Sequence, residues 1–536
     1  MRIFPLFFLF FSAAFLCQGV PAAEISVRDL GAVGDGVALD TQAIQKAIDS
    51  MADAGGGRVL FPAGSYLSGT IYLRSHVTLE LREGAVLLGS PRLEDYPVNF
   101  CKYRSYSDRY CVRALIWGED LEEIAIVGRG MIDGQGGKFF KVQASDEELE
   151  TLKKAMPDTA RYVPHSAYVN RPYGIRLIGC QNVLVEGITL QNSPMWMQQY
   201  LHCNHVTLRD LRIVNHCNSN NDMIDIDSSR NVVVTGCYGD TDDDALTLKS
   251  TGPDPTENVT ISNCILRSHV NAIKMGTESL GGFRNITISN CTILSSAVDR
   301  NHMAGNVPGY AGIALETVDG GPLERIAISN ITMNGITTPI FMRLGDRGRT
   351  VTPDAPKPQA AVFRDVSIDN IVATGVGNIA CSITGVPGHP IRGVSLSNIR
   401  IRCAGGVESV SDDLEVPEVA EKYPESTMFG ALPAYGFYCR HVEDLTFRNV
   451  TVGYEEPDAR YALVCDDVEN LGLETFQAMP SSKNSTALIL KDVRNALIRG
   501  CSPPEMNVFA RLRGGCRNVT TFGNDFGRIN TPISEE

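Results

Sequence analysis

The stretch Asn258-Val-Thr-Ile-Ser-Asn-Cys264 returns 27 residues later as Asn285-Ile-Thr-Ile-Ser-Asn-Cys291. Similar short apolar strands recur from Arg58 to Asn518, most of them 23 to 28 residues apart. This period is too short for a pair of helices and shows no helical periodicity, so each repeat fits one coil of β-structure. The sequence therefore predicts a solenoid in which every coil packs on the next.

A different pattern precedes the repeats. Residues 25–36 read as a strand followed by a glycine-rich turn, and Asp40-Thr41 can begin a helix that runs to about Ala54. The apolar face of this helix carries Ala43, Ile44, Ala47, Ile48 and Met51. An amphipathic helix over the first coil is the cap that a solenoid needs.

Length and charge limit the classes of function. A chain of 536 residues suffices for two ordinary domains, but a repeat protein of this length can be one continuous fold. The formal net charge of −14 argues against nucleic acid and anionic membrane surfaces as partners. We expect a single domain over residues 24–536, acting as a monomer.

The first 23 residues have the pattern of a secretory signal. Arg2 supplies the positive region, residues 3–16 are apolar, and small residues near Ala23 offer a cleavage site. No later stretch reaches the length of a membrane span. We therefore expect an exported protein, secreted or periplasmic, that does not contact a membrane.

Fourteen cysteines follow Cys17. Cys101 and Cys111 could form a short disulfide loop in an exported protein. Five other cysteines occupy equivalent repeat positions, namely Cys180, Cys203, Cys237, Cys264 and Cys291. Matched positions stack inside a solenoid, where a buried cysteine behaves as a small hydrophobe, so we expect a core ladder instead of disulfides there. The repeated asparagines are expected to bond the turn backbone.

An acidic stretch lies within the repeats, at residues 220–249. Its aspartates are Asp222, Asp225, Asp227, Asp240, Asp242, Asp243 and Asp244. From Asp222 to Asp243 and Asp244 the spacing is 21 and 22 residues, which returns the chain to the same side of a solenoid one coil later. Like charges on coils about 4.8 Å apart raise each other's pKa. A protonated acid beside an ionised one can cleave a glycosidic bond.

Other readings of the acidic stretch remain open. An oxygen-rich cluster on a β-coil could bind Ca²⁺ instead. Asp225 and Asp227 alternate with isoleucines, and we expect them to satisfy turn backbone or water, not to act in catalysis. Trp196 is either a core residue or a platform for a sugar ring.

Two insertions interrupt the repeats, near residues 137–170 and 404–438. The first contains a helix with a capping signal at Ser145, and the second is loop-like. Insertions in solenoids often gather on the binding face, although surface decoration is the equal alternative.

These features together resemble glycoside hydrolase family 28, the polygalacturonase family, over most of the chain. The family's active-site motifs are Asn-Thr-Asp, Asp-Asp, Gly-His-Gly and Arg-Ile-Lys. Residues 220–222 match the first with one change, and Asp243-Asp244 match the second. His269 stands at the position of the family's histidine without its flanking glycines. Ala314 and Glu316 stand where the arginine and lysine of the fourth motif belong.

The resemblance implies the fold class and the chemistry. The fold is all-β, a single right-handed parallel β-helix of the pectin-lyase-like type with a helical N-terminal cap. The activity is inverting hydrolysis of pectic polysaccharide or oligosaccharide, with no metal and no cofactor. Asp243 corresponds to the general acid, Asp222 and Asp244 to the pair that holds and deprotonates water, and His269 to the neighbour that tunes the acid.

The missing cations bear on the substrate. In the family these cations bind a galacturonate carboxylate, whereas Glu316 would repel it. Either the sugar at this position is neutral, or another residue supplies the cation. The candidates are Lys274, Arg343 and Arg347. Because insertions can wall one end of the groove, we expect cleavage from chain ends. Two other functions stay open: a Ca²⁺-dependent polysaccharide lyase with a lysine or arginine base, and a non-catalytic carbohydrate-binding β-helix.

Overall fold

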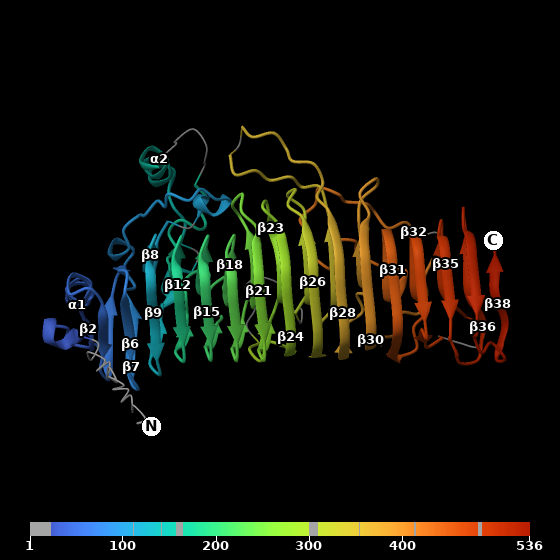
Figure 1. The fold of residues 1–536 in the computed structure, drawn as a ribbon, viewed down its shortest axis with the longest axis horizontal. Helices are drawn as coiled ribbons and strands as arrows, with labels where there is room; N and C mark the ends of the chain where they lie inside the picture. Colours follow the sequence, from blue (N-terminus) through green and yellow to red (C-terminus); the bar gives the residue numbers. More distant parts are fainter. Residues whose placement is uncertain are drawn as a thin grey trace, which may run out of the picture.

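The computed structural model describes residues 23–536, except residues 111, 141, 157–163, 300–308, 353, 412–413 and 481–484. The described strands follow one another along a single elongated β-helix, and each pairs in parallel with its counterpart one coil away (Figure 1). This confirms the predicted fold class. The expected leader lies, apart from its last residue, outside the described residues, as does Cys111 of the expected disulfide.

Three faces of paired strands make up each coil. Near the acidic stretch, the first face contains β18 (Arg230–Thr235), β21 (Thr256–Ser262) and β24 (Phe283–Ser295). The second face contains β16 (Arg212–Asn215), β19 (Tyr238–Thr241) and β22 (Ile265–Ser268). The third face contains β17 (Ile224–Asp227), β20 (Leu246–Ser250), β23 (Asn271–Ser279), β25 (Ala311–Thr317) and β27 (Thr338–Leu344).

The two copies that predicted the repeat are β21 and the start of β24. They pair in register, with Val259 opposite Ile286 and Ile261 opposite Ile288. The preceding asparagines adopt left-handed backbone conformations, which asparagine tolerates better than most residues. Their side chains bond one another across coils, as in the 2.9 Å bond from Asn285 to Asn258, and not the turn backbone that we expected.

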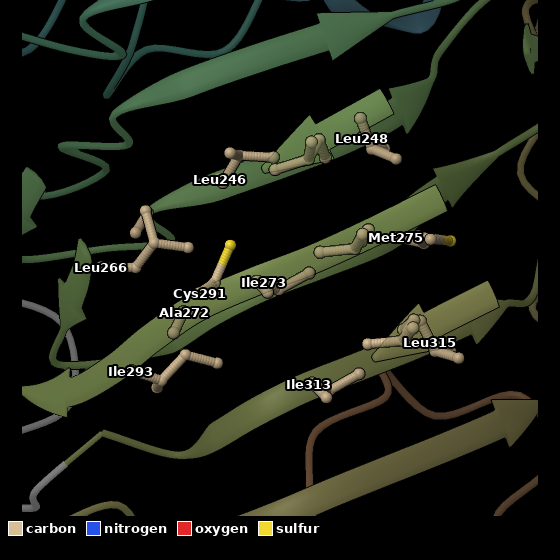
Figure 2. Close-up of a cluster of buried hydrophobic side chains, with 14 of the residues drawn as sticks. Leu246, Leu248, Leu266, Ala272, Ile273, Met275, Cys291, Ile293, Ile313 and Leu315 are labelled. Atoms are coloured by element: carbon tan, nitrogen blue, oxygen red, sulfur yellow. The ribbon is translucent and has the colours of Figure 1, made fainter. Parts of the chain in front are cut away.

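Apolar side chains of successive coils stack inside the helix. Leu246, Ile273 and Ile313 come from β20, β23 and β25 in register and point into the same core (Figure 2). The five cysteines at equivalent repeat positions are free and buried. This confirms the predicted cysteine ladder. Stacking of matched residues excludes water and leaves no gap between coils.

The N-terminal end is closed by α1 (Thr41–Asp53), as predicted. Ile44, Ala47 and Ile48 are fully buried against the first coil. Asp40 does not cap this helix through its side chain; its carboxylate accepts from the backbone amides of Val33 and Gly34 at 2.7 and 2.9 Å. Among the described residues, no helix is both long and apolar enough to cross a membrane.

Both predicted insertions project from the β-helix. The first contains α2 (Asp146–Ala155), whose N-terminus has the expected capping box between Ser145 and Glu148 and which stands out from the long edge in Figure 1. The second joins β30 (Ile391–Gly405) to β31 (Ala434–Glu456) and is irregular where it is described.

Candidate active site

The predicted acids meet where the chain turns from the second face to the third. Asp222 lies before β17, and Asp243 and Asp244 lie one coil later between β19 and β20. The backbone amide of Met223 donates to the carbonyl of Asp244 at 3.0 Å, so the two turns are adjacent. The structure thus brings the three acids to one place, as the spacing predicted.

Asp243 has the environment of a proton donor. Burial, and then the charge of Asp244, raises the pKa of Asp243 to about 7, although Lys274 and Lys249 oppose this rise. One carboxyl oxygen accepts from the backbone amide of Asp244 at 2.9 Å, and the other accepts from Asn220 at 3.4 Å. A carboxyl with this pKa is partly protonated at neutral pH.

Asp244 is held as the partner of a cation. Its Oδ2 lies 2.9 Å from Lys274 Nζ, and its Oδ1 accepts from the backbone and side-chain amides of Asn271 at 3.2 and 2.8 Å. Lys274 is also 3.7 Å from Glu425, which belongs to the second insertion. The ion pair and the two amide donors fix the position of this side chain.

Asp222 lies over a second buried lysine. Lys249 Nζ is 3.8 Å from Asp222, 3.7 Å from Asp225 and 3.6 Å from Glu278. Burial, followed by the charges of Asp225 and Asp243, raises the pKa of Asp222 well above its ordinary range. The pKa values of Asp222 and Asp243 are thus both raised, in each case mainly by burial.

His269 is buried beside the acids, but its ring nitrogens contact other groups. Nδ1 lies 3.1 Å from Asp242, and Nε2 lies 2.7 Å from the carbonyl of Val298. Burial lowers the pKa of His269, but the hydrogen bonds with Asp242 and Val298 outweigh it and the net pKa is raised. Its influence on Asp243, implied by the family resemblance, stays a prediction.

A cavity of about 320 Å³ opens above the three acids. Its aromatic lining residues are Tyr106, Tyr110, Tyr168, Trp196, Tyr310 and Tyr423. Its charged or titratable lining residues, besides the three acids, are Arg109, His165, Lys249, Glu278, Arg349 and Glu425. Aromatic faces with a few polar groups are typical of a site that binds a small ring-shaped ligand.

The insertions supply walls of this cavity. His165 and Tyr168 come from the first insertion, and Tyr423 and Glu425 from the second. Of the two readings left open for the insertions, this placement supports the binding face. Trp196 lines the cavity although only 5% of its surface is exposed, and Lys249 Nζ lies 4.5 Å from its ring. Trp196 is therefore a core residue that also forms part of the cavity wall.

The four residues predicted to bind substrate do not line the cavity. Arg343 is fully buried and donates to the carbonyls of Gly385 and Glu418 at 2.9 and 2.7 Å. Arg347 is paired with Asp319. Lys274 is committed to Asp244, as described above. Their side chains are thus engaged by the protein itself, and the expectation of direct substrate contact does not fit these positions.

Glu316 also differs from the expectation. It is fully buried on β25, and burial raises its pKa well above the ordinary range although Lys274 opposes this. Among the described residues, neither of its carboxyl oxygens has a hydrogen-bond partner. The raised pKa disfavours the charged form of Glu316, and its side chain does not line the cavity, so the argument that it repels a substrate carboxylate loses its basis.

Asp227 behaves as predicted for a structural residue, whereas neither carboxyl oxygen of Asp225 has a hydrogen-bond partner among the described residues, contrary to the prediction. Asp227 accepts from the amide and hydroxyl of Thr251 at 2.8 and 2.7 Å and from Gln199 at 2.9 Å. Asp225 lies beneath Asp222, with Lys249 as its nearest cation. Neither aspartate lines the cavity.

Sequence reasoning missed several residues of the site. Lys249 could have been found, because it lies in the acidic stretch and pairs in register with Asp227 on the third face. Arg109 and Arg349 carry no such signal, since they lie outside the repeats, Arg109 at the end of a short 3-10 helix and Arg349 in an irregular segment.

A parallel β-helix with buried aspartates at a cavity fits the class of β-helical hydrolases of glycosidic bonds. Comparison with family models narrows the class: the model described as glycosyl hydrolases family 28 matches residues 97–420, and that of rhamnogalacturonase A/epimerase, pectate lyase-like, matches residues 24–93. The chain belongs to glycosyl hydrolase family 28 and is a glycoside hydrolase.

Curated relatives carry related names. A probable polygalacturonase of Vitis vinifera is 27% identical over 402 residues, which cover 73% of this chain and 76% of the relative. The exo-poly-alpha-D-galacturonosidase of Dickeya chrysanthemi is 30% identical over 253 residues, which cover 42% of this chain and 41% of the relative.

Solved structures share the fold. A family 28 exopolygalacturonase of Yersinia enterocolitica aligns with a TM-score of 0.64 at 22% identity, covering 85% of this chain and 79% of that structure. An exopolygalacturonase of Thermotoga maritima aligns with a TM-score of 0.59 at 24% identity, covering 72% of this chain and 88% of that structure.

Proposed function

We propose that this hydrolase is exported and removes single uronate sugars from the ends of pectic chains, with inversion of the anomeric carbon. The observation that carries the proposal is the walled cavity above the acids. Its volume of about 320 Å³ is at the lower end of the range for ligand pockets. A cavity this small suits a chain end, whereas internal cleavage of a polymer needs an open groove.

The acids supply the two functions that inversion requires. Asp243, whose pKa burial raises to about 7, protonates the leaving oxygen. Asp244, which is paired with Lys274, receives the proton of the attacking water, and Asp222 holds that water in place. The two carboxyls therefore have different environments: burial raises the pKa of Asp243, and Asp244 is paired with a cation.

Two arginines favour a uronate at the chain end. Arg349 lies over the ring of Tyr106 at 4.9 Å and donates to Glu278 at 3.1 Å. Arg109 donates to the hydroxyl of Tyr106 at 2.8 Å. Both arginines line the cavity, so cations from outside the repeats take the place of the family's missing pair. The Dickeya relative's name, an exo-acting galacturonosidase, agrees with this substrate class.

The alternative of a lyase is disfavoured by the state of the lysines. A lyase needs an uncharged base, but both Lys249 and Lys274 are paired with carboxylates. Burial lowers the pKa of Lys274, yet the charges of Asp244 and Glu425 outweigh it and hold the pKa well above its ordinary value. A permanently charged lysine cannot remove a proton from the sugar.

Digestion of polygalacturonate tests the proposal. Product size by chromatography and the viscosity of the same samples should show monosaccharide from the first minutes with little loss of viscosity. A rapid viscosity drop with a ladder of oligogalacturonates would overturn end-cleavage. The absence of any release from polygalacturonate, with release from neutral pectic oligosaccharides, would overturn the uronate assignment.

A further inference from the structure

Three titratable side chains form a ladder outside the cavity. His216, Asp242 and His269 are the first residues after β16, β19 and β22. The strands pair in register up to these positions, with Asn215 and Ser268 both opposite Thr241. The three side chains therefore occupy the same place in three successive coils.

The ladder brings ligand atoms together. One nitrogen of each histidine and one oxygen of Asp242 all lie within 4.8 Å of one another, and all three residues are buried. The histidine rings are 5.3 Å apart although their residues are two coils apart, so both rings lean toward Asp242. Ligand atoms bound to one ion at about 2.0–2.1 Å lie at most about 4.2 Å apart. The three side chains would therefore need to move only slightly to coordinate one ion.

The hydrogen bonds of both histidines place a hydrogen on Nε2. His216 Nε2 lies 2.9 Å from the Asp240 carboxylate, and His269 Nε2 lies 2.7 Å from the Val298 carbonyl. A carbonyl only accepts, so His269 Nε2 carries a hydrogen, and an ionised carboxylate demands the same of His216. In neutral His216, Nδ1 then carries the lone pair, whereas His269 Nδ1 is hydrogen-bonded to the Asp242 carboxylate and must release its proton when an ion binds.

The Nδ1 lone pair of His216 has no partner among the residues that the structure describes. His216 is about nine-tenths buried, with 8% of its side chain exposed, and its Nδ1 makes no hydrogen bond. A buried polar atom without a partner costs free energy unless something binds it. The carboxylate that orients the ring is itself fixed, because Asp240 accepts from the Ser296 hydroxyl at 2.6 Å and the Ala297 amide at 3.1 Å.

We propose that His216, Asp242 and His269 bind one divalent first-row transition metal ion, such as Zn²⁺. Two imidazoles with one carboxylate suit such ions, whereas Ca²⁺ prefers a shell of oxygens. Histidine ligands usually donate their second ring N–H to a carboxylate or carbonyl, which is the arrangement of Asp240 and Val298 here. The ion would join the turns of three coils next to the acids and takes no part in the proposed hydrolysis.

Calorimetric titration of the chelator-stripped full-length protein with ZnCl₂ tests this site. We expect one Zn²⁺ per chain, no heat with CaCl₂, and a higher denaturation midpoint with Zn²⁺. His216→Ala should weaken binding at least a hundredfold. Because outer partners commonly contribute 10–100-fold to metal affinity, Asp240→Asn should weaken it by about that factor while keeping all three ligands.

The matched control is His441→Ala. His441 also lies between carboxylates, at 2.7 Å from Asp467 and 3.2 Å from Glu418, but stands far along the chain from the ladder. This variant should keep the wild-type affinity. Absence of Zn²⁺ binding by the unmodified protein, or equal binding by His216→Ala and wild type, would overturn the proposal.

Discussion

Replacing Asp243 with asparagine should lower activity and raise stability at neutral pH. The folded protein holds this buried carboxyl with a pKa of about 7 in place of its ordinary 3.8. At about 1.36 kcal/mol for each pH unit between these values, the fold disfavours the ionised form by about 4 kcal/mol. Since the folded protein binds the proton more tightly than the unfolded chain does, the wild type loses this stability as the pH rises from about 4 to about 7.

Asparagine does not ionise, so the variant does not lose this part of the folding stability as the pH rises. It keeps an acceptor for the Asp244 amide but gives up the 3.4 Å bond from Asn220, which costs about 1 kcal/mol. The free energy of unfolding of Asp243→Asn should therefore exceed that of the wild type by about 3 kcal/mol at pH 8 and fall about 1 kcal/mol below it at pH 4. Loss of a general acid should lower kcat by about 10²–10⁴-fold.

Urea denaturation at pH 4, 6 and 8, with initial rates on the same chelator-treated samples, measures both effects. Asp369→Asn is the control for the change of residue type, because its carboxylate accepts from Asn398 at 2.8 Å on an outer turn where asparagines already stack. The reasoning would be refuted by an Asp243→Asn variant with wild-type rates, or by one less stable than the wild type at every pH.

Three further outcomes are expected. Initial rates should fall about tenfold for each pH unit above pH 7, because Asp243 must hold its proton, and a flat profile to pH 9 would remove it as the acid. EDTA should leave turnover intact, since the acids do not act as metal ligands; loss of rate that Ca²⁺ restores would favour a lyase. Arg349→Ala should raise KM for oligogalacturonate about ten- to hundredfold, because it removes a charged hydrogen-bond donor from the cavity. Arg402→Ala, at an exposed arginine, is the control. An unchanged KM would mean that the substrate carboxylate binds elsewhere.

The fold could be predicted from the sequence because a solenoid repeats its physical constraints. Each coil must present strand residues of the same kind to the next, so the 27-residue copies beginning at Asn258 and Asn285 reveal both period and strand position. The same logic placed the cysteines in the core and joined Asp222 to Asp243 across one coil. The hydrogen bonds of the repeated asparagines were predicted incorrectly. The prediction considered each turn alone, whereas the partner is the asparagine side chain of the neighbouring coil.

The cavity walls could not be predicted in this way. Tyr423 reaches Lys274 from 149 residues away, through an insertion that has no periodicity to fix its position. The sequence also shows that Glu316 is a carboxyl without showing its burial, and burial decides whether it is charged. Repeats therefore predict where the acids lie, whereas substrate contacts depend on irregular segments.

The anomeric configuration of the first sugar released tests the central claim most directly. Proton NMR of a digest of oligogalacturonate, recorded before mutarotation, reports this configuration. If Asp243 donates to the leaving oxygen while Asp244 and Asp222 activate water on the opposite side, the new sugar must have the configuration opposite to that of the bond cleaved. Release of the sugar with retained configuration, or of an unsaturated product, would contradict the account.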